Sequence, residues 1–186
     1  MNQLYPPAAV CLGFFDGVHR GHLALITAAR EAARREQLQV CVHTFDHAPG
    51  NKGFELTDLA QREKLLLAAG ADRVAVSAFD DAMRTMSGPD FFRSIVLEKL
   101  NARHVVCGDD HRFGFKGAWG VEDLKVMCRE AGVGLTVVPP VVLPDGQRIS
   151  STAIRKALAE GNWALAEEML GRTLSPEAKT ALQKLA

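Results

Sequence analysis

The sequence predicts an α/β fold, with a doubly wound, mostly parallel sheet followed by C-terminal helices. Short runs that are apolar throughout alternate with longer runs whose apolar residues recur at helical spacing. Strands that are apolar on both faces are typical of parallel sheets covered by helices on each side. After Ser151, three helical patterns follow one another with no strand between them. A chain of 186 residues can bury a hydrophobic core large enough to be stable without disulfides or bound metal ions, so a single domain is expected.

Five runs have the short, apolar character of buried strands. The first ends in a glycine-containing turn, and the last is interrupted at Pro139-Pro140. In such sheets, ligands bind at the carboxyl ends of the strands, where the strand order reverses. The strands are expected at residues 8–15, 38–45, 73–79, 104–108 and 135–142.

The segments between these strands have helical periodicity. In residues 21–37, Leu23, Ile26, Ala29 and Ala33 recur at three- and four-residue spacing, which indicates an amphipathic helix. The remaining helices are expected at residues 59–69, 90–100, 120–131, 152–160, 163–170 and 176–185.

Composition excludes several classes of protein. Lys+Arg and Asp+Glu number 22 each, so the net charge is 0, without the basic surface of a duplex-binding protein. Cys11, Cys41, Cys107 and Cys128 form no close pairs, which is typical of a reducing compartment. No apolar run approaches the roughly 18 residues of a membrane helix, and residues 1–7 lack a basic leader segment. We therefore expect a soluble, cytoplasmic protein with no nucleic-acid or membrane partner; its oligomeric state stays open.

The first strand and the first helix are joined by Gly13-Phe14-Phe15-Asp16-Gly17-Val18-His19-Arg20-Gly21-His22. His19 precedes the helix and His22 lies in its first turn, so both imidazoles can face the same side. Gly17 permits a tight turn, and Gly21 lets a ligand approach the backbone. The helix N-terminus adds unpaired N–H groups and a partial positive charge. This turn predicts a phosphate site with two nitrogen donors; two histidines near a helix cap are the alternative.

A second polar block, Ile149-Ser150-Ser151-Thr152-Ala153-Ile154-Arg155, opens a late helix. Hydroxyl groups at a helix N-terminus can cap the helix or bind phosphate oxygens. Arg155 adds a cation one turn later, and a guanidinium can grip two phosphate oxygens. The block alone is typical of capping; together with the histidine motif it predicts a triphosphate site.

These two blocks resemble the motifs of the nucleotidyltransferase (HxGH) superfamily, in particular its FMN adenylyltransferase (FAD synthetase) domain. The resemblance covers about residues 8–172 and ends at Leu170-Gly171-Arg172. It implies a Rossmann-like nucleotidyltransferase fold that transfers AMP from ATP to FMN, giving FAD and pyrophosphate, with Mg²⁺ accompanying ATP. The partners implied are the small molecules ATP and FMN. The resemblance implies that His19, His22 and Arg155 are catalytic residues. Its ATP-binding residues are Gly13, Phe14, Phe15, Asp16, Gly17, His19, Gly21, His22, Ser150, Ser151, Thr152 and Arg155.

Two weaker blocks resemble the family motifs around the flavin. Thr44-Phe45-Asp46-His47-Ala48-Pro49 is similar to T-F-x-P-H-P but has His47 for Pro and Ala48 for His. Gly108-Asp109-Asp110-His111-Arg112-Phe113-Gly114 is similar to G-x-D-F-R-F-G but has His111 for Phe. Nucleotide binding is therefore better supported than the second substrate. The flavin-binding residues implied are Thr44, Phe45, Asp110 and Arg112.

The resemblance divides the chain into a transferase domain, residues 1–172, and a short helical tail, residues 173–186. In bacterial members of the family, a riboflavin kinase domain follows the L-G-R motif. Here the sequence ends fourteen residues after Arg172, so kinase activity is not expected from this chain.

Several alternatives stay open. His43 and His47 could bind zinc with Asp110 or His111, although no spacing fixes that geometry and no protein metal site is predicted. Asp109 and Asp110 could hold Mg²⁺ through water or act as turn residues. Phe115 and Trp119 could cover a planar ring or pack on their own loop. The function could instead be transfer to another phosphate-bearing acceptor, or binding of a flavin or nucleotide without turnover.

Overall fold

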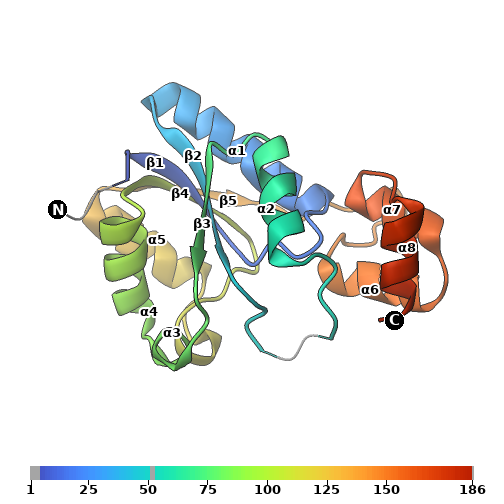
Figure 1. Cartoon of the computed structure of the whole chain (residues 1–186). Helices are drawn as coiled ribbons and strands as arrows, with labels where there is room; N and C mark the ends of the chain where they lie inside the picture. The colour runs from blue at the N-terminus through green and yellow to red at the C-terminus, as the bar shows by residue number, and fades with distance from the viewer. Residues whose placement is uncertain (1–4, 51–52, 186) are drawn as a thin grey trace.

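The computed structural model describes residues 5–50 and 53–185, which form a five-stranded parallel sheet between layers of helices (Figure 1). Parts of the expected N-terminal segment, the 44–58 loop and the tail lie outside the described residues. The strand order is β3-β2-β1-β4-β5, so the order reverses between β1 and β4. The doubly wound α/β prediction is confirmed. The strands are β1 (Ala8–Leu12), β2 (Gln39–Phe45), β3 (Arg73–Ser77), β4 (Ala102–Gly108) and β5 (Gly134–Val138).

The central strand β1 explains why the strands are apolar throughout. Side chains of a strand point alternately to the two faces of the sheet. Ala8, Val10 and Leu12 enter one core cluster, whereas Ala9 and Cys11 enter another on the opposite face. Both faces of β1 are therefore buried, as its sequence predicts.

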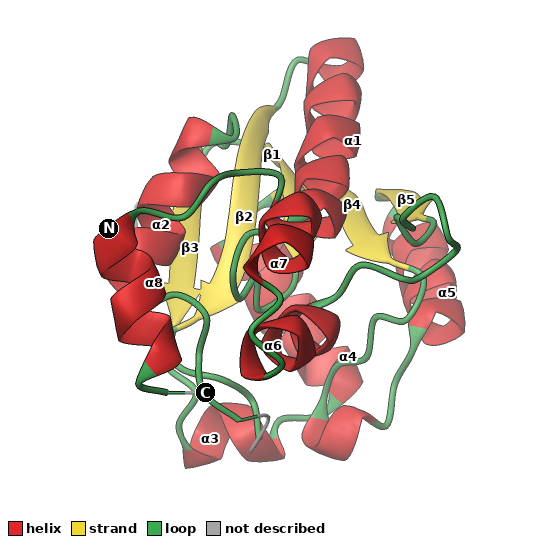
Figure 2. Cartoon of the chain, turned by 90° about the vertical axis from the view of Figure 1, so that its right-hand side faces the viewer, coloured by secondary structure: helices red, strands yellow, loops and turns green. Residues whose placement is uncertain are grey.

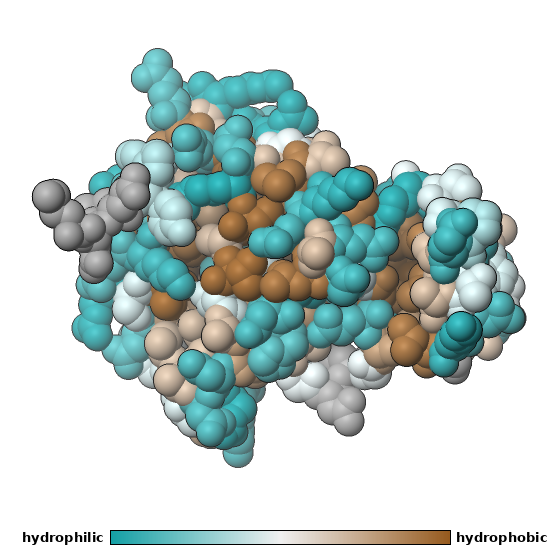
Figure 3. All heavy atoms as spheres, viewed as in Figure 1, coloured by the Kyte–Doolittle hydropathy of each residue, from teal (hydrophilic) through white to brown (hydrophobic). Residues whose placement is uncertain are grey.

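Helices α1 (Arg20–Glu36) and α2 (Leu59–Ala68) cover one face of the sheet. Helix α5 (Val121–Ala131) and the π-helical segment η1 (Phe91–Lys99) cover the other. The face shown in Figure 3 is mainly hydrophilic, with apolar patches near its centre, where the edge strand β3 lies in Figure 1. Short helices α3 (Asp81–Thr85) and α4 (Gly88–Asp90) and the 3₁₀ turn η2 (Phe115–Gly117) lie in the connections.

Helices α6 (Ser151–Ala159), α7 (Trp163–Leu170) and α8 (Pro176–Gln183) form a third cluster around buried Ile154, Met169 and Leu182. Figure 2 shows α7 beside the N-terminal end of α1. The expected helical tail thus contains α8, which packs on α6 and α7.

Some element boundaries differ from the sequence prediction. Strand β1 ends at Leu12 because Phe14 and Phe15 belong to the following turn, in which Phe15 has φ 61°. Strand β5 ends at Val138, before two prolines that cannot donate to a ladder. Helix α3 was not predicted.

The four cysteines are free and buried. Among the described residues, no helix is long and apolar enough to cross a membrane.

Candidate active site

The turn after β1 lies at the switch point of the sheet and has an unusual backbone. Phe15, Gly17 and Val18 have φ values of 61°, 81° and 43°. A β-branched residue such as Val18 rarely adopts a positive φ, so this turn holds strain. Phe15 and Val18 are almost fully buried, and their burial in the core offsets that cost. We call residues 13–19 the phosphate loop, after the phosphate site that the sequence predicts here.

His19 and His22 lie together at the start of α1. Their ring centroids are 3.6 Å apart with 19° between the planes, so the two imidazoles face the same side, as their spacing predicts. The His19 backbone N–H donates to His22 Nδ1 at 3.3 Å. Because Nδ1 of His22 accepts a hydrogen bond, its ring proton lies on Nε2 in the neutral form. His22 Nε2 is thus a donor.

Both histidines are neutral at pH 7. Burial lowers the pKa of His19 to about 4, and the positive charge of Arg172 adds to the shift. Burial also holds the pKa of His22 well below its ordinary value, with His19 and Arg172 contributing. The pair therefore offers hydrogen bonds rather than fixed positive charges. His19 Nδ1 is buried and has no hydrogen-bond partner among the described residues.

The first turn of α1 adds backbone donors beside the histidines. The helical hydrogen bonds begin with Leu23 N–H to His19 C=O at 3.0 Å, which leaves the N–H groups of the first turn unpaired within the helix. A Cβ at Gly21 would lie 3.0 Å from the His19 ring. Glycine at this position therefore leaves room for the imidazole of His19.

Asp16 connects the phosphate loop to two other segments. Its carboxylate accepts hydrogen bonds from the backbone N–H groups of Leu56 at 2.8 Å and Thr57 at 3.1 Å, and it forms an ion pair with Arg155. Its backbone carbonyl accepts from the Ser151 hydroxyl at 2.9 Å. Asp16 is only 2% exposed, and its carboxylate supports the loop through these contacts. Burial raises the pKa of Asp16, and Arg155 opposes that shift.

The late polar block lies against this loop, as a joint triphosphate site requires. Arg155 donates from Nε to the Phe54 carbonyl at 2.6 Å and from Nη2 to Asp16. Ser150 caps α6 by accepting from the Ala153 N–H at 3.1 Å. Ser150, Ser151 and Arg155 thus all have partners within the protein, whereas the Thr152 side chain is exposed.

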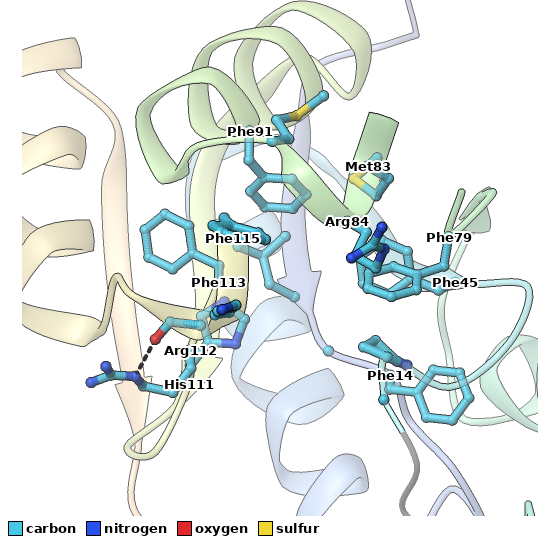
Figure 4. Close-up of a pocket in the computed structure, with 18 of the residues that line it drawn as sticks. Phe14, Phe45, Phe79, Met83, Arg84, Phe91, His111, Arg112, Phe113 and Phe115 are labelled. Carbon is cyan, nitrogen blue, oxygen red and sulfur yellow. Dashed lines mark hydrogen bonds between the residues drawn. The ribbon is translucent and has the colours of Figure 1, made fainter. Parts of the chain in front are cut away.

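A cavity of about 610 Å³ adjoins the phosphate loop at Gly13 and Phe14 (Figure 4). Its lining is mainly apolar, and cationic side chains also border it. The phenylalanine rings come from five segments, namely the loop after β1, the end of β2, the loop after β3, the start of η1 and the connection after β4. The carboxyl edge of the sheet thus brings together distant parts of the chain. The phenylalanine and cationic lining residues are Phe14, Phe45, Phe79, Arg84, Phe91, Arg112, Phe113, Phe115 and Lys116, and the imidazoles of His43 and His111 also line the cavity.

Two of the four predicted flavin residues line this cavity. Phe45 does so directly, and Arg112 does so while its Nε donates to the Gly117 carbonyl at 2.8 Å (Figure 4). Thr44 is buried, and its hydroxyl donates to the Phe14 carbonyl at 2.7 Å, so it supports the loop. Asp110 is exposed and pairs with Arg148 at 3.0 Å. Neither Thr44 nor Asp110 lines the cavity.

The zinc alternative finds no support in the described residues. His43 lines the cavity, but its Nε2 shares a hydrogen bond of 3.0 Å with Ser77 Oγ. His47 is exposed and contacts Asp46 at 2.8 Å. No three His, Cys, Asp or Glu side chains of residues 5–50 and 53–185 form a metal-binding group. Asp109, like Asp110, pairs with Arg148.

The two loop aromatics have different surroundings. Phe115 lines the cavity with 37% of its surface exposed. Trp119 is half-buried and packs against the core cluster on the face of the sheet that α5 and η1 cover. Its backbone pairs with that of Phe113. Phe115 is therefore the aromatic of this pair that faces the cavity.

Sequence reasoning missed Arg172 as a site residue. Its guanidinium donates to the carbonyls of Gly17 at 2.7 Å and Val18 at 2.9 Å. The L-G-R motif marked this position without indicating the contact. Phe79, Met83 and Phe91 were also missed as cavity residues, because their segments have no motif.

Comparison with known proteins agrees with this geometry. The family model described as FAD synthetase matches residues 2–153, which is most of the chain. The chain belongs to the FAD synthetase family. It is 34% identical over 169 residues to the bifunctional riboflavin kinase/FMN adenylyltransferase of Escherichia coli (strain K12), covering 86% of this chain and 53% of that protein. The chain thus spans about half the length of this relative.

Two further similar proteins extend the comparison. A putative bifunctional riboflavin kinase/FMN adenylyltransferase of Geobacillus thermodenitrificans is 34% identical over 174 residues, covering 91% of this chain and 93% of that protein. A crystal structure of a Streptococcus pneumoniae protein described as a macrolide-efflux protein superposes with a TM-score of 0.80 at 31% identity, covering 92% of this chain and 58% of that one. The similarity therefore reaches beyond the motifs to the whole fold.

Proposed function

We propose that this chain transfers AMP from ATP to FMN, giving FAD and pyrophosphate. The observation that carries the proposal is the junction of two sites: the loop that precedes the two stacked histidines also lines an aromatic cavity, through Gly13 and Phe14. An adenylyl transfer needs a polyphosphate and a flavin phosphate side by side, and this junction suits that requirement.

No protein nucleophile is needed for the reaction. A phosphate oxygen of FMN attacks the α-phosphorus of ATP, the bond from that phosphorus to the bridging oxygen breaks, and pyrophosphate leaves with the electron pair. Negative charge then grows on the leaving phosphate. His22 Nε2–H and the first-turn N–H groups of α1 would donate to that charge, which stabilises the transition state more than the ground state. The protein otherwise contributes the alignment of the two substrates.

Arg155 would act from the edge of this site. Its Nε and Nη2 are held by Phe54 and Asp16, so its guanidinium has a fixed position beside the loop. The exposed Thr152 hydroxyl could contact phosphate oxygens from the start of α6. These contributions stay predictions of the motif.

Mg²⁺ would enter with ATP rather than bind to a prepared protein site. Asp16, the carboxylate within the loop, is buried and already accepts two backbone N–H groups and the guanidinium of Arg155. The carboxylate of Asp16, which is closest in sequence to the histidine pair, is therefore not placed to bind a metal ion in this conformation. Phosphate oxygens and water would hold the ion and share its charge, as is common for Mg²⁺.

The cavity suits the flavin ring of FMN. Its volume of about 610 Å³ lies within the usual range of ligand pockets, and aromatic side chains favour a planar aromatic ligand. Phe45 and Arg112 are the predicted flavin residues in position to contact it. ATP as co-substrate and the free, buried cysteines fit a cytoplasmic enzyme.

The test is incubation with FMN, ATP and Mg²⁺, followed by chromatography for FAD and an assay for pyrophosphate. Stoichiometric FAD and pyrophosphate would support the proposal. Binding of FMN and ATP without FAD would indicate a module without turnover. Pyrophosphate release with a different phosphate-bearing acceptor, but not with FMN, would indicate another nucleotidyltransferase.

A further inference from the structure

Arg172 approaches the phosphate loop from the far end of the chain. It follows the end of α7, where Gly171 has φ 72° and turns the chain towards the start of α1. Its two terminal nitrogens donate to consecutive carbonyls, Nη2 to Gly17 at 2.7 Å and Nη1 to Val18 at 2.9 Å. The guanidinium is partly buried and spans 154 residues of sequence to reach Val18. This contact connects the segment after α7 to the backbone of the phosphate loop.

The Val18 carbonyl leads directly to the histidine pair. In a trans peptide the C=O and the next N–H point in opposite directions within one plane. The carbonyl of Val18 points to Arg172, so the N–H of His19 points away from it, and that N–H donates to His22 Nδ1. One rigid peptide therefore connects the guanidinium of Arg172 with the imidazole of His22.

The backbone at this peptide is strained, so contacts from outside the loop are needed to stabilise its conformation. Val18 has φ 43° and Gly17 has φ 81°, so the loop has little intrinsic preference for this conformation at Val18. A fork of two donors fixes the orientation of both carbonyls at once, which a single donor does less well. Strain of this kind persists where the surroundings over-determine the conformation.

We infer that Arg172 is a positioning residue for the transfer reaction: through the Val18–His19 peptide it holds His22 as the tautomer with its proton on Nε2, facing the phosphate site. The catalytic consequence rests on the proposed function, whereas the tautomer assignment does not. The positive charge of Arg172 acts in the same direction, because it contributes to the low pKa of both histidines and so favours the neutral ring.

The experiment combines ¹⁵N NMR of the histidine rings with steady-state kinetics. In the unaltered chain, we expect His22 to show a protonated Nε2 and an unprotonated Nδ1. In Arg172→Gln, we expect a mixture of tautomers and a kcat lower by about 10- to 100-fold, the cost of a misplaced reacting group, with a much smaller change in the KM for ATP. Arg172→Lys keeps the charge and one donor and should recover part of the loss.

Arg73 supplies a matched control at the amino end of the sheet. It also donates to two carbonyls, those of Leu100 at 2.9 Å and Pro6 at 3.3 Å. Arg73→Gln should lower stability while leaving the His22 tautomer and kcat unchanged.

A native His22 tautomer and a normal kcat in Arg172→Gln would overturn the inference. So would equal losses of activity in the Arg172 and Arg73 variants, because both would then be structural. If Arg172→Gln does not fold, Arg172→Lys gives the same comparison. If the unaltered chain makes no FAD, the proposed function fails, and the NMR comparison alone decides the role of Arg172.

Discussion

At the scale of single residues, burial changes what the two motif histidines can do. Exposed histidines at a phosphate site could be cations, but His19 and His22 are buried beside Arg172 and have low pKa values. In the proposed reaction they would therefore contribute directional hydrogen bonds, which depend on which ring nitrogen carries the proton. Orientation and tautomer matter more than charge at this site.

The first prediction concerns His22. His22→Ala should lower kcat by about 10²–10³, the usual loss for one donor aimed at developing charge. The KM for ATP should change much less, because the contact strengthens as pyrophosphate leaves. Steady-state kinetics with FMN and ATP measure both effects.

His104→Gln is the control for this variant. His104 contacts Glu36 and Thr136 through its ring and does not line the cavity. Its replacement should leave kcat unchanged. Normal turnover in His22→Ala would remove the catalytic role of His22.

The second prediction concerns Arg155 and its buried partner. Removing one member of a buried ion pair leaves the other charge without compensation, which typically costs about 3–5 kcal/mol. Because Asp16 is buried and paired with Arg155, Arg155→Ala should lower the unfolding free energy by about 3 kcal/mol. Asp16→Asn in the Arg155→Ala background should restore part of it, since Asn keeps an acceptor for the Leu56 and Thr57 N–H groups.

Urea unfolding of the two single variants and the double variant measures this coupling. Additive losses would show that the two side chains do not stabilise each other. A native stability of Arg155→Ala with reduced activity would instead make Arg155 purely a phosphate ligand.

These residues show what sequence reasoning can and cannot reach. The spacing of His19 and His22 predicted a shared face because helical geometry is local. The partner of Arg155 was not predictable, because Asp16 lies 139 residues away and an arginine at a helix start suits phosphate or carboxylate equally. Motifs identify residue types, whereas tertiary packing decides which of them remain free for a ligand.

At the scale of elements, the connection between β4 and α5 builds one wall of the cavity. This connection passes through Phe113, Gly114 and Phe115. Gly114 has φ 71°, and a Cβ there would lie 2.5 Å from the Trp119 ring and 2.6 Å from the Gly88 backbone nitrogen. The wall is therefore held against α4 at a point where no side chain fits.

The third prediction follows from this close approach. Gly114→Ala should lower the unfolding free energy by about 3 kcal/mol, from backbone strain and overpacking together. It should also raise the KM for FMN, because the cavity wall must move, while the KM for ATP stays nearly unchanged. Urea unfolding and kinetics with each substrate varied in turn give the three values.

Gly146→Ala is the control that separates the cost of backbone strain from the cost of overpacking. Gly146 has φ 87°, but a Cβ there meets nothing within 4 Å. It should cost only about 1 kcal/mol and leave both KM values unchanged. Equal effects of the two variants would show that the cavity wall is not packed as described.

Element boundaries were predictable where local chemistry determines them. The apolar runs predicted all five strands, and Pro139-Pro140 explains why β5 stops at Val138. The five-residue helix α3 has too few turns to show a period, so its contribution of Met83 to the cavity was invisible in the sequence. The helix expected at residues 90–100 is present as η1, but its π-helical winding was not predicted.

At the scale of the whole molecule, the site depends on all three core clusters. One cluster holds Phe15 and Val18 of the phosphate loop, and the second holds Phe91 and Phe113 of the cavity. The third positions α7 and so brings Arg172 to the loop. The helices after residue 150 are thus part of the site, and the loss of any one cluster would disturb it.

The fourth prediction is that the protein loses stability as pH falls from about 6.5 to 4. Burial lowers the pKa of His19 to about 4, of His43 to about 3 and of His111 to about 4. In the unfolded chain a histidine has a pKa of about 6.5, so in this window the unfolded state binds protons that the folded state does not. The unfolding free energy therefore rises with pH, by up to about 1.4 kcal/mol per pH unit for each histidine whose pKa is lowered. Urea unfolding at pH 7.5, 6.5, 5.5 and 4.5 measures this slope.

His111→Phe removes one titrating group, so the slope should fall by up to about 1.4 kcal/mol per pH unit relative to the unaltered chain. A flat unfolding free energy between pH 6.5 and 4.5 would show that these histidines take up protons without unfolding, and that the rings at the site are more open to water than their packing implies.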